Sequence, residues 1–250
     1  MGPLPSSDPF KPKRYFLDLY IPSYTPSLSA LIESREESPQ VPKKPSLLLV
    51  AHLHDSLPGV KGEIKVVRAL KAQVKVTELV SSEATPPSVV EGLPTSVVEG
   101  LRHNQFAHIA CHGVLETGKP FDASFKLHDK SRLTLLDIAR SRLPHAEFAF
   151  LSCCHAAEIT DGSVADEVLH LTAAMQYCGF RSVVGTMWEM ADTDGRDMAK
   201  NFYRSLFSSQ ETRFPYYERS AGALRDAVRM LRGKRKTSLE QWVNFVHYGA

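Results

Sequence analysis

Phe106-Ala-His-Ile-Ala-Cys-His-Gly113 and Phe148-Ala-Phe-Leu-Ser-Cys-Cys-His155 are the two segments that decide the fold of this chain. Each is a short apolar run that ends abruptly in residues capable of nucleophilic chemistry. A run of this kind, closed by glycine or polar residues, is typical of a buried strand. Because open α/β sheets place their active sites at the carboxyl ends of neighbouring strands, the two segments predict a cysteine nucleophile served by a histidine base.

The composition is that of an ordinary globular protein, with 250 residues, 43% hydrophobic and 23% charged residues, and a net charge of +2. This length allows one large α/β domain with a buried core. The charge gives no reason to expect nucleic-acid binding, and no run approaches the roughly 18 to 20 apolar residues of a membrane span. The N-terminus lacks a secretory signal and the four cysteines form no extracellular disulfide framework, so we expect a cytoplasmic protein with reduced thiols.

Strands alternate with helices along most of the chain. We expect residues 1–14 to be loose and residues 15–250 to form one domain. Besides the two opening segments, the apolar pattern predicts strands at Phe16–Tyr20, Leu47–Ala51, Val74–Leu79, Phe125–Leu127 and Arg181–Trp188. Helices are predicted at Ser27–Glu37 with Ser27 as N-cap, at Lys61–Leu70, within 86–101, from near Thr134, at Ala165–Tyr177, and at roughly 195–208, 217–232 and 239–246. This alternation is typical of a mostly parallel sheet covered by helices on both faces.

The chemistry of the two segments requires a thiol, a base and an oxyanion donor. A free thiol with a pKa near 8.5 is only a few per cent thiolate at neutral pH, so a neighbouring imidazole must accept its proton. His112 can supply that base, Gly113 an amide without a side chain for the oxyanion, and Cys154 the nucleophile. Spacing alone leaves Cys153 open as the nucleophile and His108 as the base. The position of His108, deeper in the apolar run, is more typical of a hydrogen-bonded core histidine.

A zinc site is the alternative interpretation of the same side chains. The candidate ligands are His108, Cys111, His112, Cys153, Cys154 and His155. The paired spacing of structural zinc sites is absent, and ligands on buried parallel strands rarely converge tetrahedrally. We therefore expect neither a metal nor another cofactor.

Several ungapped blocks resemble one known family. In chain order they are Pro22-Ser-Tyr-Thr-Pro-Ser-Leu-Ser-Ala-Leu31, His108-Ile-Ala-Cys-His-Gly113, Leu151-Ser-Cys-Cys-His-Ala-Ala157, Asp166-Glu-Val-Leu-His-Leu171, Gly179-Phe-Arg-Ser-Val-Val-Gly-Thr-Met-Trp188 and Trp242-Val-Asn-Phe-Val-His-Tyr-Gly249. From about Tyr20 to the last residue the chain is similar to the CHAT domain, a caspase-like peptidase domain often attached to tetratricopeptide repeats, and in particular to its fungal type.

The resemblance implies a caspase–hemoglobinase-like three-layer sandwich, with a mostly parallel central sheet flanked by helices. It also implies cysteine endopeptidase activity on protein substrates. The catalytic histidine of the family falls on His112 and its cysteine on Cys154, while Cys153 replaces the usual alanine. The expected partners are a protein substrate and a repeat-containing regulatory domain, with no nucleic acid and no membrane.

The chain also departs from the family pattern. Fungal relatives usually have Ala-Cys-His-Thr-Ala at the nucleophile, where this chain has Cys153-Cys-His-Ala-Ala157. They also carry an upstream strand with paired tryptophans and, before the block that begins at Pro22, a Leu-Pro-x-His-Ala-Ala-Gly stretch that only Gly2–Pro5 faintly resembles here. We therefore expect a fragment of a larger product or a form with an incomplete sheet edge. The alternative function is a catalytically impaired interaction or signalling module.

Cleavage specificity is predicted from the acidic residues that follow the nucleophile. Glu158, Asp161, Asp166 and Glu167 all lie within a short stretch after Cys154. A carboxylate in a desolvated pocket pairs strongly with a substrate guanidinium, which favours cleavage after a basic residue with Asp166 as the substrate-binding residue. The competing interpretation is that these acids stabilise the first turn of the following helix.

Overall fold

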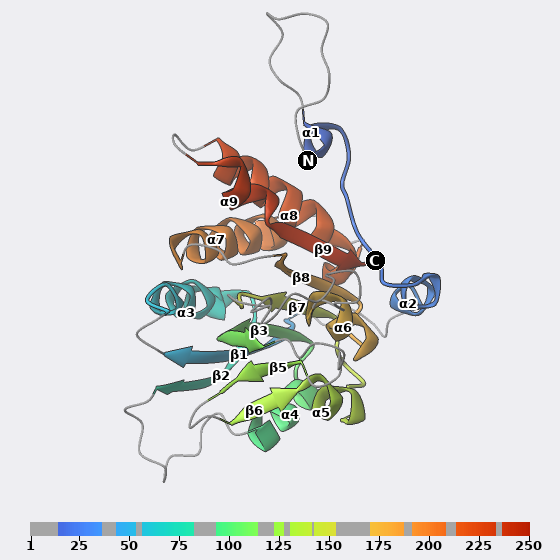
Figure 1. Cartoon of the computed structure of the whole chain (residues 1–250), viewed down its shortest axis with the longest axis vertical. Helices are drawn as coiled ribbons and strands as arrows, with labels where there is room; N and C mark the ends of the chain where they lie inside the picture. The colour runs from blue at the N-terminus through green and yellow to red at the C-terminus, as the bar shows by residue number, and fades with distance from the viewer. Residues whose placement is uncertain are drawn as a thin grey trace, which may run out of the picture.

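A six-stranded sheet lies between two layers of helices (Figure 1), which confirms the predicted α/β class. The computed structural model describes residues 15–36, 44–53, 57–82, 94–114, 123–127, 131–141, 143–153, 171–187, 192–208, 214–233 and 237–250. The strand order is β2-β1-β3-β7-β8-β9. Every pair in this sheet is parallel except β8 with β9, which is antiparallel.

The central strands form because their apolar runs can be buried on both faces. Their bounds are β1 Ser46–Leu53, β2 Lys75–Ser82, β3 Phe106–Ala110, β7 Phe148–Leu151, β8 Ser182–Thr186 and β9 Phe245–Gly249. Every residue of β3 and β7 is buried. Alternate residues of these strands belong to two separate apolar cores, one on each face of the sheet.

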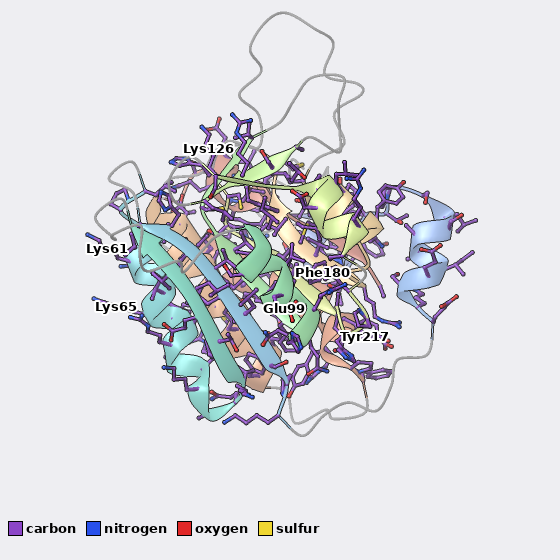
Figure 2. The ribbon with its side chains drawn as sticks, turned by 90° about the horizontal axis from the view of Figure 1, so that it is seen from below. Lys61, Lys65, Glu99, Lys126, Phe180 and Tyr217 are labelled. Carbon is purple, nitrogen blue, oxygen red and sulfur yellow. The ribbon has the colours of Figure 1, made fainter. Side chains whose placement is uncertain are left out.

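One core lies beneath α3 Val60–Arg68, α7 Asp192–Ser208, α8 Tyr216–Arg232 and α9 Leu239–Val243. The other lies beneath α4 Pro94–His103, α5 Leu135–Arg140 and α6 Leu171–Tyr177. Helix α3 continues into the 3₁₀ turn η1 Ala69–Ala72. Its lysines Lys61 and Lys65 project away from the sheet (Figure 2), as expected for an amphipathic helix with one buried stripe.

A small antiparallel sheet lies beside the carboxyl end of β3, and only its middle strand overlaps a strand predicted as separate from the segment through His112, Phe125–Leu127. It contains β4 His112–Val114, β5 Ser124–Lys126 and β6 Arg132–Thr134, in the order β4-β5-β6. The predicted strand through His112 is therefore wrong at its end, because β3 stops at Ala110 and the chain bends at Cys111. Helix α5 begins after Thr134, whose hydroxyl accepts a hydrogen bond from Asp137 N at 3.1 Å, as expected for an N-cap.

The predicted strand Phe16–Tyr20 is wrong, because these residues form the short helix α1 Phe16–Leu19. Asp18 explains the difference: its carboxylate accepts a hydrogen bond from Tyr15 N at 2.9 Å and pairs with Arg232 near the end of α8. Tyr15 also packs edge-on against Trp242, with ring centroids 5.3 Å apart. These tertiary contacts are invisible in a local apolar pattern. The next helix, α2 Leu28–Ser34, has the predicted N-cap, since the Ser27 hydroxyl accepts from Ala30 N.

The last strand, β9, corrects the predicted helix at 239–246. Helix α9 ends at Val243, and Phe245–Gly249 pairs with β8 instead. Gly249 has a φ of +116°, and a Cβ there would lie 2.0 Å from the carbonyl oxygen of Arg181, so only glycine fits. On its other side β9 bonds to the N-terminal segment: Tyr24 N donates to His247 O at 2.8 Å, and Gly249 N donates to Tyr24 O at 2.9 Å.

Candidate active site

The carboxyl ends of β3 and β7 lie side by side at one edge of the central sheet. The two strands pair in parallel with Ile109 opposite Leu151. One residue further on, Ser152 N donates a 2.8 Å hydrogen bond to Ile109 O. The segment leading to His112 and the segment leading to Cys153 therefore leave the sheet together. Cys154 and Asp166, both predicted site residues, lie outside the described residues.

His112 and Gly113 are held in the small sheet directly after the bend. His112 is half-buried and pairs with Lys126 of β5, while Gly113 is buried and pairs with Phe125. The predicted base and the predicted oxyanion donor are thus fixed by backbone pairing on an antiparallel ladder. They are not carried on a loose loop after β3.

Cys153 points into the core, where its thiol meets that of Cys111. Both residues are buried, and the Cys153 sulfur lies 3.6 Å from Ile109 O. The hydrogen bond with the Cys111 thiol raises the pKa of Cys153 well above its usual value, and burial raises it further. A thiol that keeps its proton is a poor nucleophile, which speaks against Cys153 as the reactive cysteine.

His108 lies in the opposite core, within a chain of buried hydrogen bonds. Its Nδ1 is 2.9 Å from the Tyr203 hydroxyl, and its Nε2 is 3.2 Å from the Oε2 atom of Glu63. Burial, followed by the charge of Glu63, raises the pKa of Tyr203 well above its usual value, so the phenol keeps its proton and donates to Nδ1. The imidazole also stacks on Phe150 with ring centroids 5.1 Å apart. These contacts are those of the predicted core histidine.

The other members of this chain of hydrogen bonds were not singled out from the sequence. Glu63 accepts a 2.9 Å hydrogen bond from the Ser152 hydroxyl, and both side chains are buried. A signal for Glu63 does exist, because this acid shares the apolar stripe of α3 with Val60 and Ile64. An acid on a buried stripe needs partners, but only the three-dimensional arrangement identifies them.

A second buried histidine, His247 on β9, connects four segments of the chain. Ser23 donates to Gly249 O, so its oxygen accepts from His247 Nδ1–H at 2.7 Å. Nε2 then accepts a hydrogen bond on its other side, where the Ser182 and Ser220 hydroxyls lie 2.7 and 2.8 Å away. Burial lowers the pKa of His247 to about 3, so this imidazole is neutral and its role is structural.

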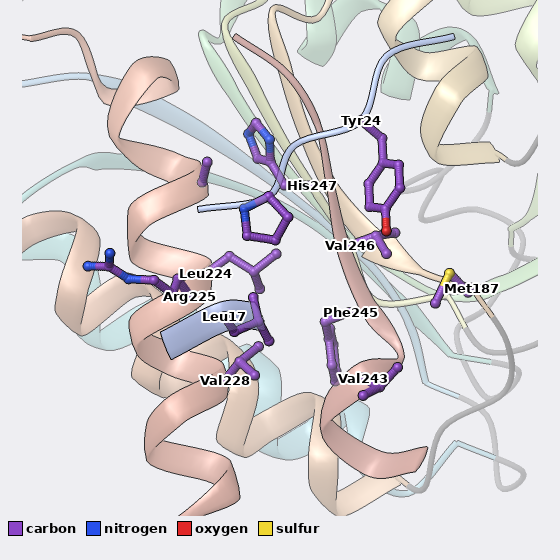
Figure 3. A pocket seen from close by; sticks show the side chains of 12 residues that line it. Leu17, Tyr24, Met187, Leu224, Arg225, Val228, Val243, Phe245, Val246 and His247 are labelled. Atoms are coloured by element: carbon purple, nitrogen blue, oxygen red, sulfur yellow. The ribbon is translucent and has the colours of Figure 1, made fainter. Parts of the chain in front are cut away.

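Two of the concavities in the described part of the chain lie away from the His112 segment. A cavity of about 120 Å³ is enclosed by α1, α8 and β9 (Figure 3), with Leu17, Leu224, Val228 and Phe245 among its apolar lining residues. A wider groove of about 870 Å³ runs between α3 and α7. Neither has His112 or Cys153 among its lining residues.

Within the described residues there is no group of three or more His, Cys, Asp or Glu side chains that could hold a metal ion. No described helix has the length and apolar character needed to cross a bilayer.

Comparison with solved structures identifies the class of fold. The Saccharomyces cerevisiae separase in complex with securin superimposes with a TM-score of 0.57 at 15% identity, over 91% of this chain and 14% of separase. The Arg-specific cysteine proteinase gingipain R of Porphyromonas gingivalis superimposes with a TM-score of 0.54 at 9% identity, over 82% of this chain and 46% of the gingipain chain. The chain therefore spans less than half the length of either protein. At these identities the likeness shows the fold alone, which is that of the caspase-like clan.

A family comparison then makes the assignment narrower. The CHAT domain family matches residues 4–250, so nearly the whole chain is covered and the chain belongs to this family. The predicted resemblance is thereby confirmed. A comparison with curated protein sequences gives no match.

Proposed function

We propose that this chain is a cysteine endopeptidase in which His112 is the general base and Cys154 the nucleophile. The observation that carries the proposal is the pairing of β3 with β7, which brings the two segments to the same edge of the sheet. Membership of a caspase-like peptidase family and the buried, protonated state of Cys153 support it. A crossover fold of this kind places reactive side chains at the carboxyl ends of its strands.

The reaction follows from the chemistry of these groups. His112 accepts the thiol proton of Cys154, and the sulfur forms a bond to the carbonyl carbon of the scissile peptide. The negative charge that develops on the carbonyl oxygen is stabilised by the N–H of Gly113. Breaking the C–N bond releases the amine, which takes the proton from His112, and leaves a thioester on Cys154. A water molecule deprotonated by His112 then hydrolyses the thioester, releasing the carboxylic acid and the thiol.

For substrate specificity we propose cleavage after Arg or Lys, with Asp166 pairing with the substrate cation. The acids that follow Cys154 support this preference. The structurally similar gingipain R is an Arg-specific proteinase. A panel of fluorogenic peptides with Arg, Lys or Asp before the scissile bond tests the idea, with Asp166→Asn as the variant and Glu158→Gln as its matched control. Preference for Asp over Arg in the wild type contradicts it.

The dyad itself is tested with a thiol-directed peptidyl electrophile carrying Arg or Lys, followed by mass mapping. We expect labelling at Cys154 in the wild type and none at that position in Cys154→Ala or His112→Ala. An electrophile carrying Asp serves as the specificity control. If neither probe labels Cys154, the proposal of a working peptidase is wrong.

A binding module is the second candidate function, and the surface of the N-terminal segment favours it. Its exposed large apolar side chains include Leu28, 70% exposed, and Ile32, 58% exposed, both on α2. Exposed apolar clusters mark protein interaction sites, and a helical repeat domain is the partner that the family suggests. The discriminating observation is the behaviour of Cys154→Ala in cells. A chain without the thiol that keeps the full biological effect favours the binding module over the peptidase.

A further inference from the structure

Glu63 is a buried acid that the reaction proposed above does not use. It lies on α3, where its neighbours on the same stripe, Val60, Ile64 and Val67, pack into the core. Only 3% of its surface is exposed. Transfer of a carboxyl group from water into a protein interior is strongly unfavourable unless hydrogen bonds compensate for it. The role of this acid therefore follows from the groups to which it is hydrogen-bonded.

The partners of Glu63 show where its hydrogen bonds are directed. Oε2 accepts from His108 on β3, and Oε1 accepts from the hydroxyl of Ser152, the residue directly after β7. His108 is in turn fixed by the Tyr203 hydroxyl and by stacking on Phe150. The carboxyl group therefore connects helix α3 with two adjacent strands. One of its two contacts falls on the first residue beyond the sheet.

Ser152 and Cys153 are held from several directions. The Ser152 hydroxyl donates to Glu63 on one face of the sheet, and the Ser152 backbone N–H donates sideways to Ile109 O. On the opposite face the Cys153 thiol meets Cys111, and from β8 the Thr186 hydroxyl donates to Cys153 O at 3.4 Å. In sequence the next residue is Cys154. The direction of the chain at Ser152 and Cys153 is thus set by these contacts, and the 2.9 Å bond from Ser152 to Glu63 is shorter than the bond from Thr186.

We propose that Glu63 is a positioning residue for the nucleophile, acting through the hydroxyl of Ser152. This inference rests on the proposed function, because it assumes that Cys154 is the reacting thiol. Glu63 takes no part in proton transfer to the substrate. Its hydrogen bond fixes the Ser152 side chain, and with it the segment that carries Cys154 toward His112. The stacked and hydrogen-bonded imidazole of His108 holds the carboxyl group in the orientation that this contact needs.

The test measures inactivation of the full chain by the Arg-bearing peptidyl electrophile, separating the maximal rate kinact from the half-saturation constant KI. We compare the wild type with Ser152→Ala, Glu63→Gln, Glu63→Ala and the double variant Glu63→Ala/Ser152→Ala. Ser220→Ala is the matched control, because it also removes a buried hydroxyl, which lies on α8 and contacts His247 instead of Glu63. Labelling is mapped to Cys154 by mass spectrometry across a range of pH.

For Ser152→Ala we expect kinact to fall on the order of tenfold or more, with KI within about twofold, since misplacing a reacting group by a fraction of an ångström has effects of this size. Ser220→Ala is expected to keep kinact within about twofold. Glu63→Gln keeps an oxygen that accepts from Ser152, so its loss is expected to be smaller than that of Ser152→Ala. The double variant is expected to be no slower than Ser152→Ala, because both changes break the same contact.

Three results overturn the inference while leaving the proposed function intact. The first is wild-type labelling at Cys154 with an unchanged kinact in Ser152→Ala, and the second is an equal loss of kinact in Ser152→Ala and Ser220→Ala. The third is an additive loss in the double variant. If Glu63→Ala does not fold, Ser152→Ala and Glu63→Gln still decide the matter. A wild type that neither the Arg-bearing nor the Asp-bearing electrophile labels at Cys154 removes the proposed function, and this inference is overturned with it.

Discussion

Lowering the pH is expected to destabilise the protein through His247. In the folded chain this imidazole is buried, with a pKa of about 3, against the ordinary value of 6.5. Between these values the unfolded chain binds a proton that the folded chain does not. The contribution of His247 to the free energy of unfolding is therefore largest above about pH 6.5 and falls as the pH drops toward 3.

The magnitude follows from the size of the shift. Each pH unit below the unfolded pKa lowers the free energy of unfolding by about 1.4 kcal/mol until the folded pKa is reached. Between about pH 8 and about pH 5 the loss from this one residue is about 2 kcal/mol. Such a loss is a large fraction of the total stability of a typical domain.

Urea unfolding of the wild type and of His247→Gln at several pH values measures this contribution. The other titrating groups are shared by both proteins, so their effects cancel in the difference between the two curves. We expect the free energy of unfolding of the wild type, relative to that of the variant, to fall by about 2 kcal/mol between about pH 8 and about pH 5. Parallel pH dependences in the two proteins contradict this prediction.

Three further outcomes are expected. Iodoacetamide is expected to leave Cys153 unmodified in the native protein and to label it after unfolding, because the bond to Cys111, followed by burial, raises the pKa of its thiol. Labelling in the folded chain at the rate of an exposed thiol contradicts this. Thr134→Ala is expected to lower the free energy of unfolding in urea by about 1 kcal/mol, because it removes the N-cap of α5. Thr134→Ser is the control that keeps the cap. Asp18→Asn is expected to lower the free energy of unfolding by up to about 1 kcal/mol and to speed proteolysis near α1. The bond from Arg232 lowers the pKa of the Asp18 carboxyl, so the stabilisation by this ion pair is present above about pH 3.8 and lost below it. An unchanged rate of cleavage contradicts the role of this ion pair in holding α1.

The central sheet could be predicted from the sequence because its strands carry their own signal. The runs Phe106–Ala110 and Phe148–Leu151 are apolar throughout, so any arrangement that buries them on both faces makes them inner strands of a parallel sheet. Helix α2 could be placed for a similar local reason, since Ser27 caps it. Such features depend only on residues that are neighbours in the chain.

Other elements depend on contacts that no local pattern contains. The residues of α1 form a helix because Asp18 is bound by Arg232, far along the chain, and β9 forms because β8 offers an antiparallel edge after Val243. The same limit applies to the site. His108 could be assigned to the core from its place in an apolar run, whereas Glu63 becomes informative only when Ser152 is seen beside it.

The segment from Tyr15 to Tyr24 links the end of α8 to the outer side of β9, and this has a mechanical consequence. Tyr24 is bonded to both His247 and Gly249, so the N-terminal segment and the last strand bear load together. A force applied upstream of Tyr15 is transmitted to the Asp18–Arg232 ion pair and the Tyr24 bonds before it reaches β3 or β7. Tension on the chain upstream of Tyr15 would therefore detach the segment Tyr15–Tyr24 from α8 and β9 first, while β9 stays paired with β8.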